Sequence, residues 1–217
     1  MNHSKARFNM VEQQVRPWQV LDPAVLQSLS RLPREQFVPA GLESLAYTDT
    51  DIPIGHGQSL LAARIDARLA QDLELQPSDR VLDIGTGSGF LAALLADLAQ
   101  TVVSLEVNAA LADAARQRLA RLGKAQVEVL TRDASAGLGD LGRFDAIVLG
   151  GSVAEVPESL LALLKPGGRL LAVVGDEPIM RVERHVCVAD GQFASQSLWD
   201  IVTPRLQGFA EHPSFSF

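Results

Sequence analysis

The chain has 217 residues, a net charge of −7, and 47% hydrophobic and 21% charged residues, a composition typical of globular proteins. Its single cysteine excludes a disulfide framework, and its four histidines show no metal-ligand spacing, so no metal site is expected. We find no secretory signal segment, and no apolar run reaches the roughly 20 residues of a membrane span. The acidic balance disfavours nucleic acid as a partner. We therefore expect a cytoplasmic protein with one domain over residues 1–217.

The N-terminal segment, residues 1–79, is predicted to be mainly helical and to pack on the remainder of the chain. Asp22 and Pro23 begin one helix, and a second is predicted over Leu60–Leu75. Between them, residues 46–58 are rich in Asp, Pro and Gly, which predicts a loop. The apolar residues of each helix share one face, and they are Val25, Leu26, Leu29 and Leu32 in the first and Leu61, Ile65, Leu69 and Leu73 in the second.

The rest of the chain predicts an α/β fold, Rossmann-like and doubly wound, with a mainly parallel sheet. Strands are expected at Arg80–Gly85, Thr101–Val107, Val127–Arg132, Asp145–Gly150 and Arg169–Gly175. Helices are expected at Gly87–Gln100, Ala109–Leu122 and Pro157–Leu164, the last followed by a turn at Lys165–Gly168. Alternating residues on both sides of Asp190-Gly191, a strong hairpin signal, predict antiparallel strands at the end of the sheet. The phenylalanines of the C-terminal tail show no period.

The segment VLDIGTGSGF, Val81 to Phe90, joins a strand to a helix through three glycines. Glycine is needed where the backbone turns tightly or approaches a ligand, and the helix N-terminus adds free N–H donors. The dinucleotide pattern G-x-G-x-x-G requires a glycine where Phe90 stands, which disfavours NAD. Asp83 would repel a pyrophosphate but suits the ammonium group of S-adenosylmethionine (AdoMet).

Two further acids follow the next two strands. Glu106 could accept hydrogen bonds from ribose hydroxyls, and Asp133 could hold the adenine amino group. Each acid alone could be a solvated strand end, but together with the glycine loop they predict AdoMet as the cofactor. The predicted cofactor-binding residues are Asp83, Gly85, Thr86, Gly87, Ser88, Gly89, Glu106, Val107, Asp133 and Ala134.

Five stretches carry a resemblance to a known family: LPREQFVP (Leu32–Pro39), AYTDTDIPIGHGQS (Ala46–Ser59), VLDIGTGSGF, FDAIVLGG (Phe144–Gly151) and KPGGRLLAVVG (Lys165–Gly175). Through these the chain resembles the protein-L-isoaspartate O-methyltransferase family over most of its length. The resemblance implies a class I methyltransferase fold, AdoMet as methyl donor, and methylation of a carboxylate on an altered aspartyl residue of a protein or peptide. It also implies that Asp83 and Gly85–Gly89 line the methionine end of AdoMet, Glu106 the ribose, and Asp133 with Ala134 the adenine.

The acceptor side departs from the family pattern. The family has Thr-Ile-Ser after Gly-Gln, then a small or polar residue and Pro, and its serine is the active-site residue. Here Ser59 stands at the threonine position, Leu61 occupies the serine position, and the proline is missing. Leucine offers no hydrogen bond to a carboxylate, and Leu61 equally suits the apolar core. The acceptor-site candidates are therefore Gln58, Ser59, Leu61 and His56, the last of which could also be a plain loop residue.

No catalytic residue is assigned, because a carboxylate with a pKa near ~4 is already ionised at neutral pH and positioning does most of the work. Two alternatives stay open: a methyltransferase of the same fold with another acceptor, such as a small-molecule acid or a nucleobase, or a weak AdoMet- or S-adenosylhomocysteine-binding protein. Asp49 and Asp51 either orient an acceptor or cap a turn. Arg64 either binds an acidic substrate or lies on a helix surface.

Overall fold

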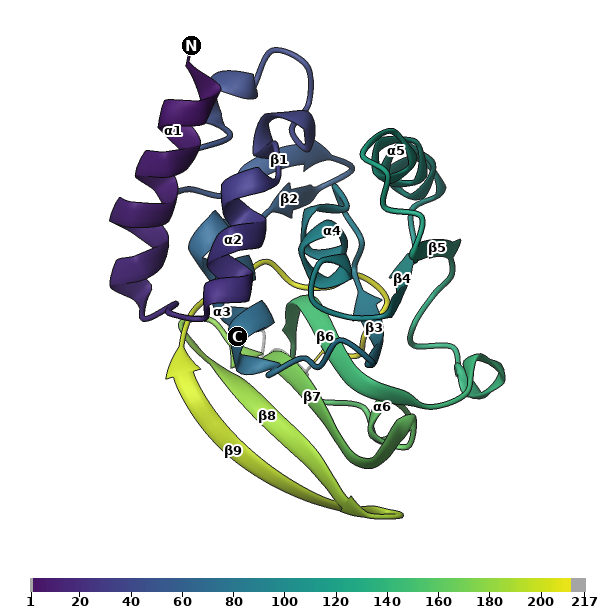
Figure 1. Cartoon of the computed structure of the whole chain (residues 1–217). Coiled ribbons are helices and arrows are strands. Elements are labelled where there is room, and N and C mark those ends of the chain that lie inside the picture. The colour runs from purple at the N-terminus through teal and green to yellow at the C-terminus, as the bar shows by residue number, and fades with distance from the viewer. Residues whose placement is uncertain (1, 212–217) are drawn as a thin grey trace, which may run out of the picture.

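The computed structural model describes residues 2–211, which build helices around one large sheet (Figure 1). The helices are α1 (His3–Met10), α2 (Pro23–Arg31), α3 (Ala63–Asp72), α4 (Phe90–Ala96), α5 (Ala109–Arg121) and α6 (Glu158–Leu161). Short 3₁₀ or π segments occupy Val11–Val15, Arg16–Trp18, Arg34–Gln36, Glu43–Leu45 and Gly139–Leu141. The strands are β1 (Ile52–Gly55), β2 (Gln58–Leu60), β3 (Arg80–Ile84), β4 (Thr101–Glu106), β5 (Val127–Thr131), β6 (Phe144–Val153), β7 (Leu164–Asp176), β8 (Ile179–Ala189) and β9 (Gln192–Asp200). Phe215 and Phe217 lie outside the described residues.

Seven strands form the large sheet in the order β5-β4-β3-β6-β7-β8-β9. The strands from β3 to β7 are parallel, and β8 and β9 continue the sheet in antiparallel pairs. The chain runs outward from β3 through β4 to β5 and then returns to β6 on the other side of β3. This reversal is a topological switch point, where open α/β sheets bind ligands at the carboxyl ends of the strands. The predicted fold class, including the antiparallel C-terminal strands, is confirmed.

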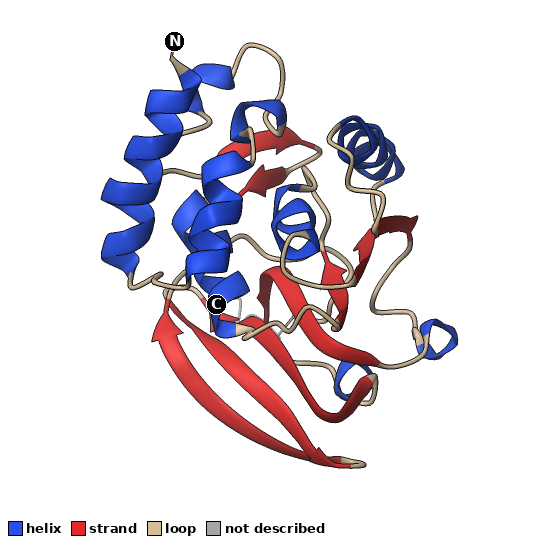
Figure 2. Ribbon diagram, in the orientation of Figure 1, coloured by secondary structure: helices blue, strands red, loops and turns tan. Residues whose placement is uncertain are grey.

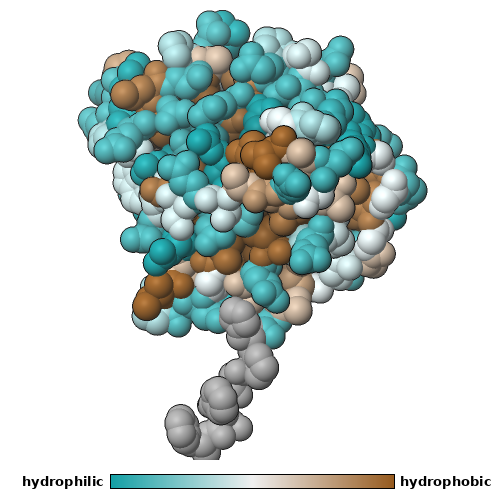
Figure 3. All heavy atoms as spheres, turned by 90° about the horizontal axis from the view of Figure 1, so that it is seen from below, coloured by the Kyte–Doolittle hydropathy of each residue, from teal (hydrophilic) through white to brown (hydrophobic). Residues whose placement is uncertain are grey.

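Side-chain alternation along the strands gives the sheet two apolar faces. Val81 and Val148 pack on one face with residues from α1 to α5, while Leu82 and Leu149 pack on the other. The second face is covered more thinly, by α6, the loop after β5 and Leu206. Figure 2 shows this asymmetry, with most helices gathered on one side of the sheet. In the space-filling view from below, apolar side chains are visible in several areas between polar ones (Figure 3).

The segment over residues 46–58, expected to be a loop, holds β1 and leads into β2 as a small antiparallel hairpin. Ile52 pairs with Leu60, and Pro53 pairs with Ser59. The Gly and Asp content that predicted a loop marks the hairpin tip and its approach, where His56 has a positive φ of 53°. Strands this short carry too few alternating residues to be recognised from the pattern.

The second N-terminal helix begins at Ala63, because residues up to Leu60 belong to β2. The expectation that Leu61 lies on this helix is therefore wrong, although its side chain is buried, with an exposed fraction of 4%, in the same core as Ile65 and Leu69. The fourth-residue spacing continues by chance into the preceding link.

Three other expected boundaries also change. The Lys165–Gly168 turn lies inside β7 as an irregularity, because the pairing with β6 shifts register there. The helices after the glycine loop and before β7 are shorter than expected, at Phe90–Ala96 and Glu158–Leu161. Within residues 2–211, no helix combines the length and apolar character needed to cross a membrane.

Candidate functional site

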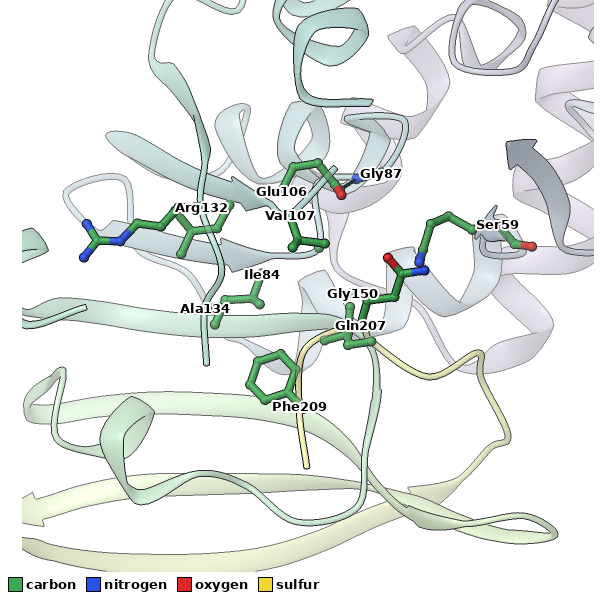
Figure 4. Close-up of a pocket in the computed structure, with 14 residues that line it drawn as sticks. Ser59, Ile84, Gly87, Glu106, Val107, Arg132, Ala134, Gly150, Gln207 and Phe209 are labelled. Carbon is green, nitrogen blue, oxygen red and sulfur yellow. Dashed lines mark hydrogen bonds between the residues drawn. The ribbon is translucent and has the colours of Figure 1, made fainter. Parts of the chain in front are cut away.

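A pocket lies at the switch point, where β3, β4 and β6 end (Figure 4). Its walls come from β2, the glycine loop, the ends of β4 and β5, β6 and the C-terminal segment. The lining residues are Gln58, Ser59, Ile84, Gly85, Gly87, Leu105, Glu106, Val107, Arg132, Ala134, Gly150, Leu206, Gln207 and Phe209. Five of the ten predicted cofactor residues and two of the four acceptor candidates therefore meet in one place.

The glycine loop turns around the end of β3 through backbone hydrogen bonds. The N–H groups of Gly85 and Thr86 donate to the Leu105 carbonyl at 2.9 and 3.0 Å, which ties the loop to β4. Gly87 has a φ of 51°, a backbone conformation that favours glycine, and a Cβ there would lie 3.2 Å from the Ile54 side chain of the β1–β2 hairpin. Gly89 instead faces α5, so it serves helix packing and does not line the pocket.

Glu106 is the polar anchor of this pocket. Its side chain is buried, with an exposed fraction of 4% for the residue, at the end of β4. One carboxylate oxygen accepts from the Gly87 N–H at 2.8 Å, and the other accepts from the Asn108 N–H at 2.9 Å. Each oxygen keeps acceptor capacity for a further donor. The geometry therefore presents a fixed carboxylate that could accept hydrogen bonds from a vicinal diol.

Asp83 lies beneath the glycine loop and does not line the pocket. The Ser104 hydroxyl donates to one of its oxygens at 2.6 Å, and the Ser104 oxygen also lies 2.6 Å from the Thr86 hydroxyl. Burial, together with the charge of Glu106, raises the pKa of the Asp83 carboxyl to about 7 against the effect of the Ser104 hydrogen bond. Asp83 is therefore not placed to contact a ligand in this pocket directly. Its charged form would act on the ligand from beneath the glycine loop.

The expected adenine side is formed mainly by apolar groups. Ala134 and Val107 line the pocket together with Phe209, whereas the Asp133 carboxylate accepts from the N–H and hydroxyl of Ser135 at 2.8 and 2.7 Å. Arg132 also lines the pocket, but its guanidinium extends away from the centre and binds Asp140 (Figure 4).

The acceptor candidates occupy three different places. Gln58 and Ser59 line the pocket from β2, and Ser59 lies on the opposite side of it from Arg132 (Figure 4). Leu61 lines a small adjoining cavity of about 30 Å³, together with Thr86, Ser88 and Asp66; we call this the inner cavity. It shares Ser59, Gly85, Gly87 and Gly150 with the main pocket. His56 lies at the hairpin tip and does not line either cavity, although its carbonyl lies 3.5 Å from the Gln207 side-chain nitrogen.

The charged candidates near the acceptor side are bound by other protein groups. Arg64 forms an ion pair with Asp49 at 2.7 Å, and its guanidinium carbon lies 4.1 Å from the centre of the Trp18 ring. Asp51 accepts a hydrogen bond from the Ala62 N–H at 2.8 Å. All three side chains are therefore engaged with protein groups, although neither aspartate caps a turn and Arg64 packs on Trp18 instead of lying on an open helix surface.

The C-terminal segment forms part of the pocket that sequence reasoning missed. Leu206 lies against the glycine loop, since a Cβ on Gly85 would be 2.6 Å from its side chain. Ser152 of β6 fixes the segment, because its N–H donates to the Pro204 carbonyl and its carbonyl accepts from the Leu206 N–H, both at 2.9 Å. The sequence there carries no recognisable signal. Gly150 was also missed, although a glycine near the carboxyl end of a strand could have indicated it.

The polar groups of the pocket fit an adenosyl ligand better than a metal ion. Among residues 2–211, no group of three or more His, Cys, Asp or Glu side chains is arranged to hold a metal. The space open to water-sized probes is about 50 Å³, so the pocket is narrow, and Leu206 is the side chain that lies against Gly85.

The chain is similar to known proteins in sequence and in fold. The family model for protein-L-isoaspartate(D-aspartate) O-methyltransferase (PCMT) matches residues 5–202. A protein-L-isoaspartate O-methyltransferase of Methanoculleus marisnigri is 44% identical over 171 residues, covering 79% of this chain and 78% of the relative. Protein-L-isoaspartate O-methyltransferase 1 of Geotalea uraniireducens is 41% identical over 195 residues, covering 88% of each chain.

Solved structures agree in fold. A crystal structure from Plasmodium falciparum, described as a protein-L-isoaspartate O-methyltransferase in complex with S-adenosyl-L-homocysteine, matches with a TM-score of 0.77 at 22% identity, over 94% of this chain and 97% of that one. The extent of the family match and the identity of the relatives decide the classification, and the expected enzyme class is confirmed with it. The chain belongs to the protein-L-isoaspartate O-methyltransferase family of AdoMet-dependent methyltransferases.

Proposed function

We propose that this chain transfers a methyl group from AdoMet to the carboxylate of an isoaspartyl residue in a protein or peptide. The observation that carries the proposal is the meeting of Gly87, Glu106 and Ser59 around one pocket. In this arrangement Glu106 would accept from the ribose hydroxyls, Gly85–Gly87 would hold the methionine part, and Val107, Ala134 and Phe209 would hold the adenine. The acceptor enters from the side of Gln58 and Ser59.

The charges around the pocket support a cationic ligand. Asp83 and Glu106 are both buried close to the glycine loop, and the one cationic residue that lines the pocket, Arg132, is bound to Asp140. AdoMet carries an ammonium and a sulfonium, whereas a dinucleotide carries a pyrophosphate that these acids would repel. The same charges favour AdoMet over NAD. So does Phe90, which stands where the dinucleotide pattern requires glycine.

When bound, AdoMet would supply an electrophilic methyl group to the acceptor carboxylate, with S-adenosylhomocysteine as the leaving group of an in-line displacement. The work of the chain is then to position the acceptor and to exclude water. An acceptor carboxylate is ionised at neutral pH and needs no general base, so no pocket residue has to be assigned that role. Gln58 and Ser59 offer hydrogen-bonding groups toward the acceptor, while Ile84, Leu105 and Leu206 give the pocket apolar walls.

Leu61 does not take the place of an active-site serine in this proposal. Its side chain is buried and its carbonyl accepts a hydrogen bond from Arg34, so it serves the packing of the acceptor segment. The nearest hydroxyl on the same segment is that of Ser59, which lines the pocket. We therefore assign to Ser59 the contact with the acceptor that the family serine provides.

The test is a methyl-transfer assay with an isoaspartyl peptide and the same peptide containing ordinary aspartate. We expect transfer to the isoaspartyl peptide alone, with calorimetry showing that AdoMet binds and NAD does not. Binding of AdoMet without transfer to either peptide would reject the proposed acceptor but keep the cofactor. A panel of small-molecule acids and nucleobases then examines the other acceptors. Failure to bind AdoMet would reject the whole proposal.

A further inference from the structure

Arg34 is a buried arginine close to the proposed acceptor side. It lies in the 3₁₀ segment Arg34–Gln36, and its exposed fraction is 0%. Its Nε donates to the Ala46 carbonyl at 2.9 Å, and Nη2 donates to the Leu61 carbonyl. Arginine is seldom fully buried unless its donors are paired. Here Nε and Nη2 are paired with carbonyls, whereas Nη1 makes no hydrogen bond with the described residues.

Two further contacts extend the reach of Arg34 to the cofactor side. Its Nη1 lies 3.5 Å from a carboxylate oxygen of Asp66 on α3, and Asp66 is 3% exposed and lines the inner cavity. Its guanidinium carbon lies 4.4 Å from the centre of the Phe90 ring. Phe90 is the first residue of α4, the helix that follows the glycine loop. One side chain therefore connects the segment after β2 with the helix that begins at the glycine loop.

The acceptor segment, Ser59–Ala62, is held from two directions. Arg34 donates to the carbonyl of Leu61, and Asp51 accepts from the N–H of the next residue, Ala62, at 2.8 Å. Charge-assisted hydrogen bonds of this kind are roughly twice as strong as neutral ones and directional. Consecutive residues of the segment are thus fixed by charged side chains, two residues beyond Ser59.

Packing alone does not explain this choice of residues. Burial lowers the pKa of Arg34, and it raises the pKa of Asp66 to about 7 despite the opposing charge of Arg34, so desolvation works against both ions. Apolar side chains often fill such space at equal or better stability. A guanidinium, however, can bind two carbonyls and a carboxylate at once in a fixed geometry, which neither lysine nor an apolar residue can do.

We propose that Arg34 and Asp66 are positioning residues for methyl transfer, which hold Gln58 and Ser59 at the correct distance from the glycine loop. Arg34 acts through the backbone of the acceptor segment, and Asp66 balances the charge of Arg34 as its ion-pair partner. This inference rests on the proposed acceptor site, since it assigns a task to residues that do not line the main pocket.

The experiment compares Arg34→Lys with a matched control, Arg169→Lys. Arg169 also binds backbone carbonyls and an aspartate: it donates to the carbonyls of Glu74 and Asp145 at 2.8 and 3.1 Å, and it pairs with Asp79 at 2.6 Å. It stands near the start of β7, away from the pocket lining. Both substitutions remove a buried or half-buried guanidinium clamp, but only one of them touches the acceptor segment.

Three quantities are measured in each protein: kcat and KM for the isoaspartyl peptide, the Kd for AdoMet, and amide hydrogen exchange over residues 58–63. In Arg34→Lys we expect kcat/KM for the peptide to fall about 10–100-fold through misplacement of the acceptor groups. Exchange over residues 58–63 should accelerate, and the Kd for AdoMet should stay within about threefold of wild type. Arg169→Lys should leave all three unchanged, even where its melting temperature is lower.

A merely structural role predicts a different pattern, in which peptide kinetics, AdoMet affinity and exchange throughout the protein deteriorate together. That pattern, or unchanged exchange over residues 58–63 in Arg34→Lys, overturns the inference. Should Arg34→Lys fail to fold, Asp66→Asn replaces it, because the amide keeps the shape of the side chain; the same selective acceleration over residues 58–63 is expected, and its absence counts against the proposal. Hydrogen exchange needs no acceptor, so it tests whether Arg34 holds residues 58–63 even where wild type fails to methylate the peptide, and the two failures remain distinguishable.

Discussion

The cofactor side and the acceptor side of the pocket are built in different ways. On the cofactor side, a carboxylate at the end of β4 accepts from a backbone N–H of the glycine loop, so adjacent strand ends of one sheet supply the geometry. On the acceptor side, a three-residue strand and the link after it are held by Arg34 and Asp51, which stand 27 and 11 residues away from the backbone groups that they bind. The first depends on the sheet itself, whereas the second depends on charged side chains that are distant in sequence.

The largest effect on the cofactor side is expected at Gly87. We expect Gly87→Val to abolish measurable AdoMet binding, because a side chain there strains a backbone with positive φ and enters the space between the loop and Ile54. The control is Gly123→Val, where φ is also positive, at 70°, but a Cβ would meet nothing within 4 Å. Calorimetric titration of both variants separates loss of the site from strain alone. Normal AdoMet affinity in a folded Gly87→Val protein contradicts close backbone approach.

The second-largest effect on AdoMet binding is expected at Glu106. Glu106→Ala removes the acceptor of the Gly87 and Asn108 N–H groups and the proposed ribose contact, so AdoMet binding should weaken by about 1–3 kcal/mol. Asp133→Ala is the companion variant, because the Asp133 carboxylate is engaged with Ser135 and does not line the pocket. We expect a smaller loss there. Equal affinities of Glu106→Ala and wild type would mean that the adenosyl part lies elsewhere.

Sequence reasoning succeeded where structure is local. The glycine loop, the strand that precedes it and the acid that ends the next strand follow from short-range patterns, and parallel strands bring their carboxyl ends together. It failed where contacts are distant in sequence. Leu206 reaches the glycine loop through backbone bonds to Ser152, and Arg34 reaches Leu61 across 27 residues, neither of which any local period reveals. Because the short β1–β2 hairpin was not predicted, the predicted start of α3 was too early, and Leu61 was wrongly placed on that helix.

Leu61 tests the acceptor side directly. Leu61→Ser should lower the free energy of unfolding by about 2–4 kcal/mol, because a buried leucine becomes small and polar. It should not raise the rate of isoaspartyl methylation, since the side chain at this position belongs to the core and the inner cavity. Denaturant unfolding and the peptide assay are read together. A gain of about tenfold or more in kcat/KM, equivalent to roughly 1.4 kcal/mol, would place Leu61 in the acceptor site and contradict its assignment to the core.

The smallest effect concerns protons on the cofactor side. Burial raises the pKa of Asp83 to about 7, so near neutral pH this carboxyl is partly protonated, and its charged form is the one that favours a cation. Binding of cationic AdoMet should lower this pKa and release up to about half a proton at pH 7. The affinity for AdoMet should therefore rise as pH increases from about 6 to 8. S-adenosylhomocysteine, which lacks the sulfonium charge, should show a weaker pH dependence. Calorimetry in two buffers of different ionisation enthalpy measures the protons released. Asp83→Asn should flatten the pH dependence. Asp66→Asn should reduce it less, because Asp66, whose pKa is also raised to about 7 and whose charge interacts with that of Asp83, is paired with Arg34. If Asp66→Asn flattens it equally, the two sides of the pocket share one buried charge system and the contrast between them no longer holds.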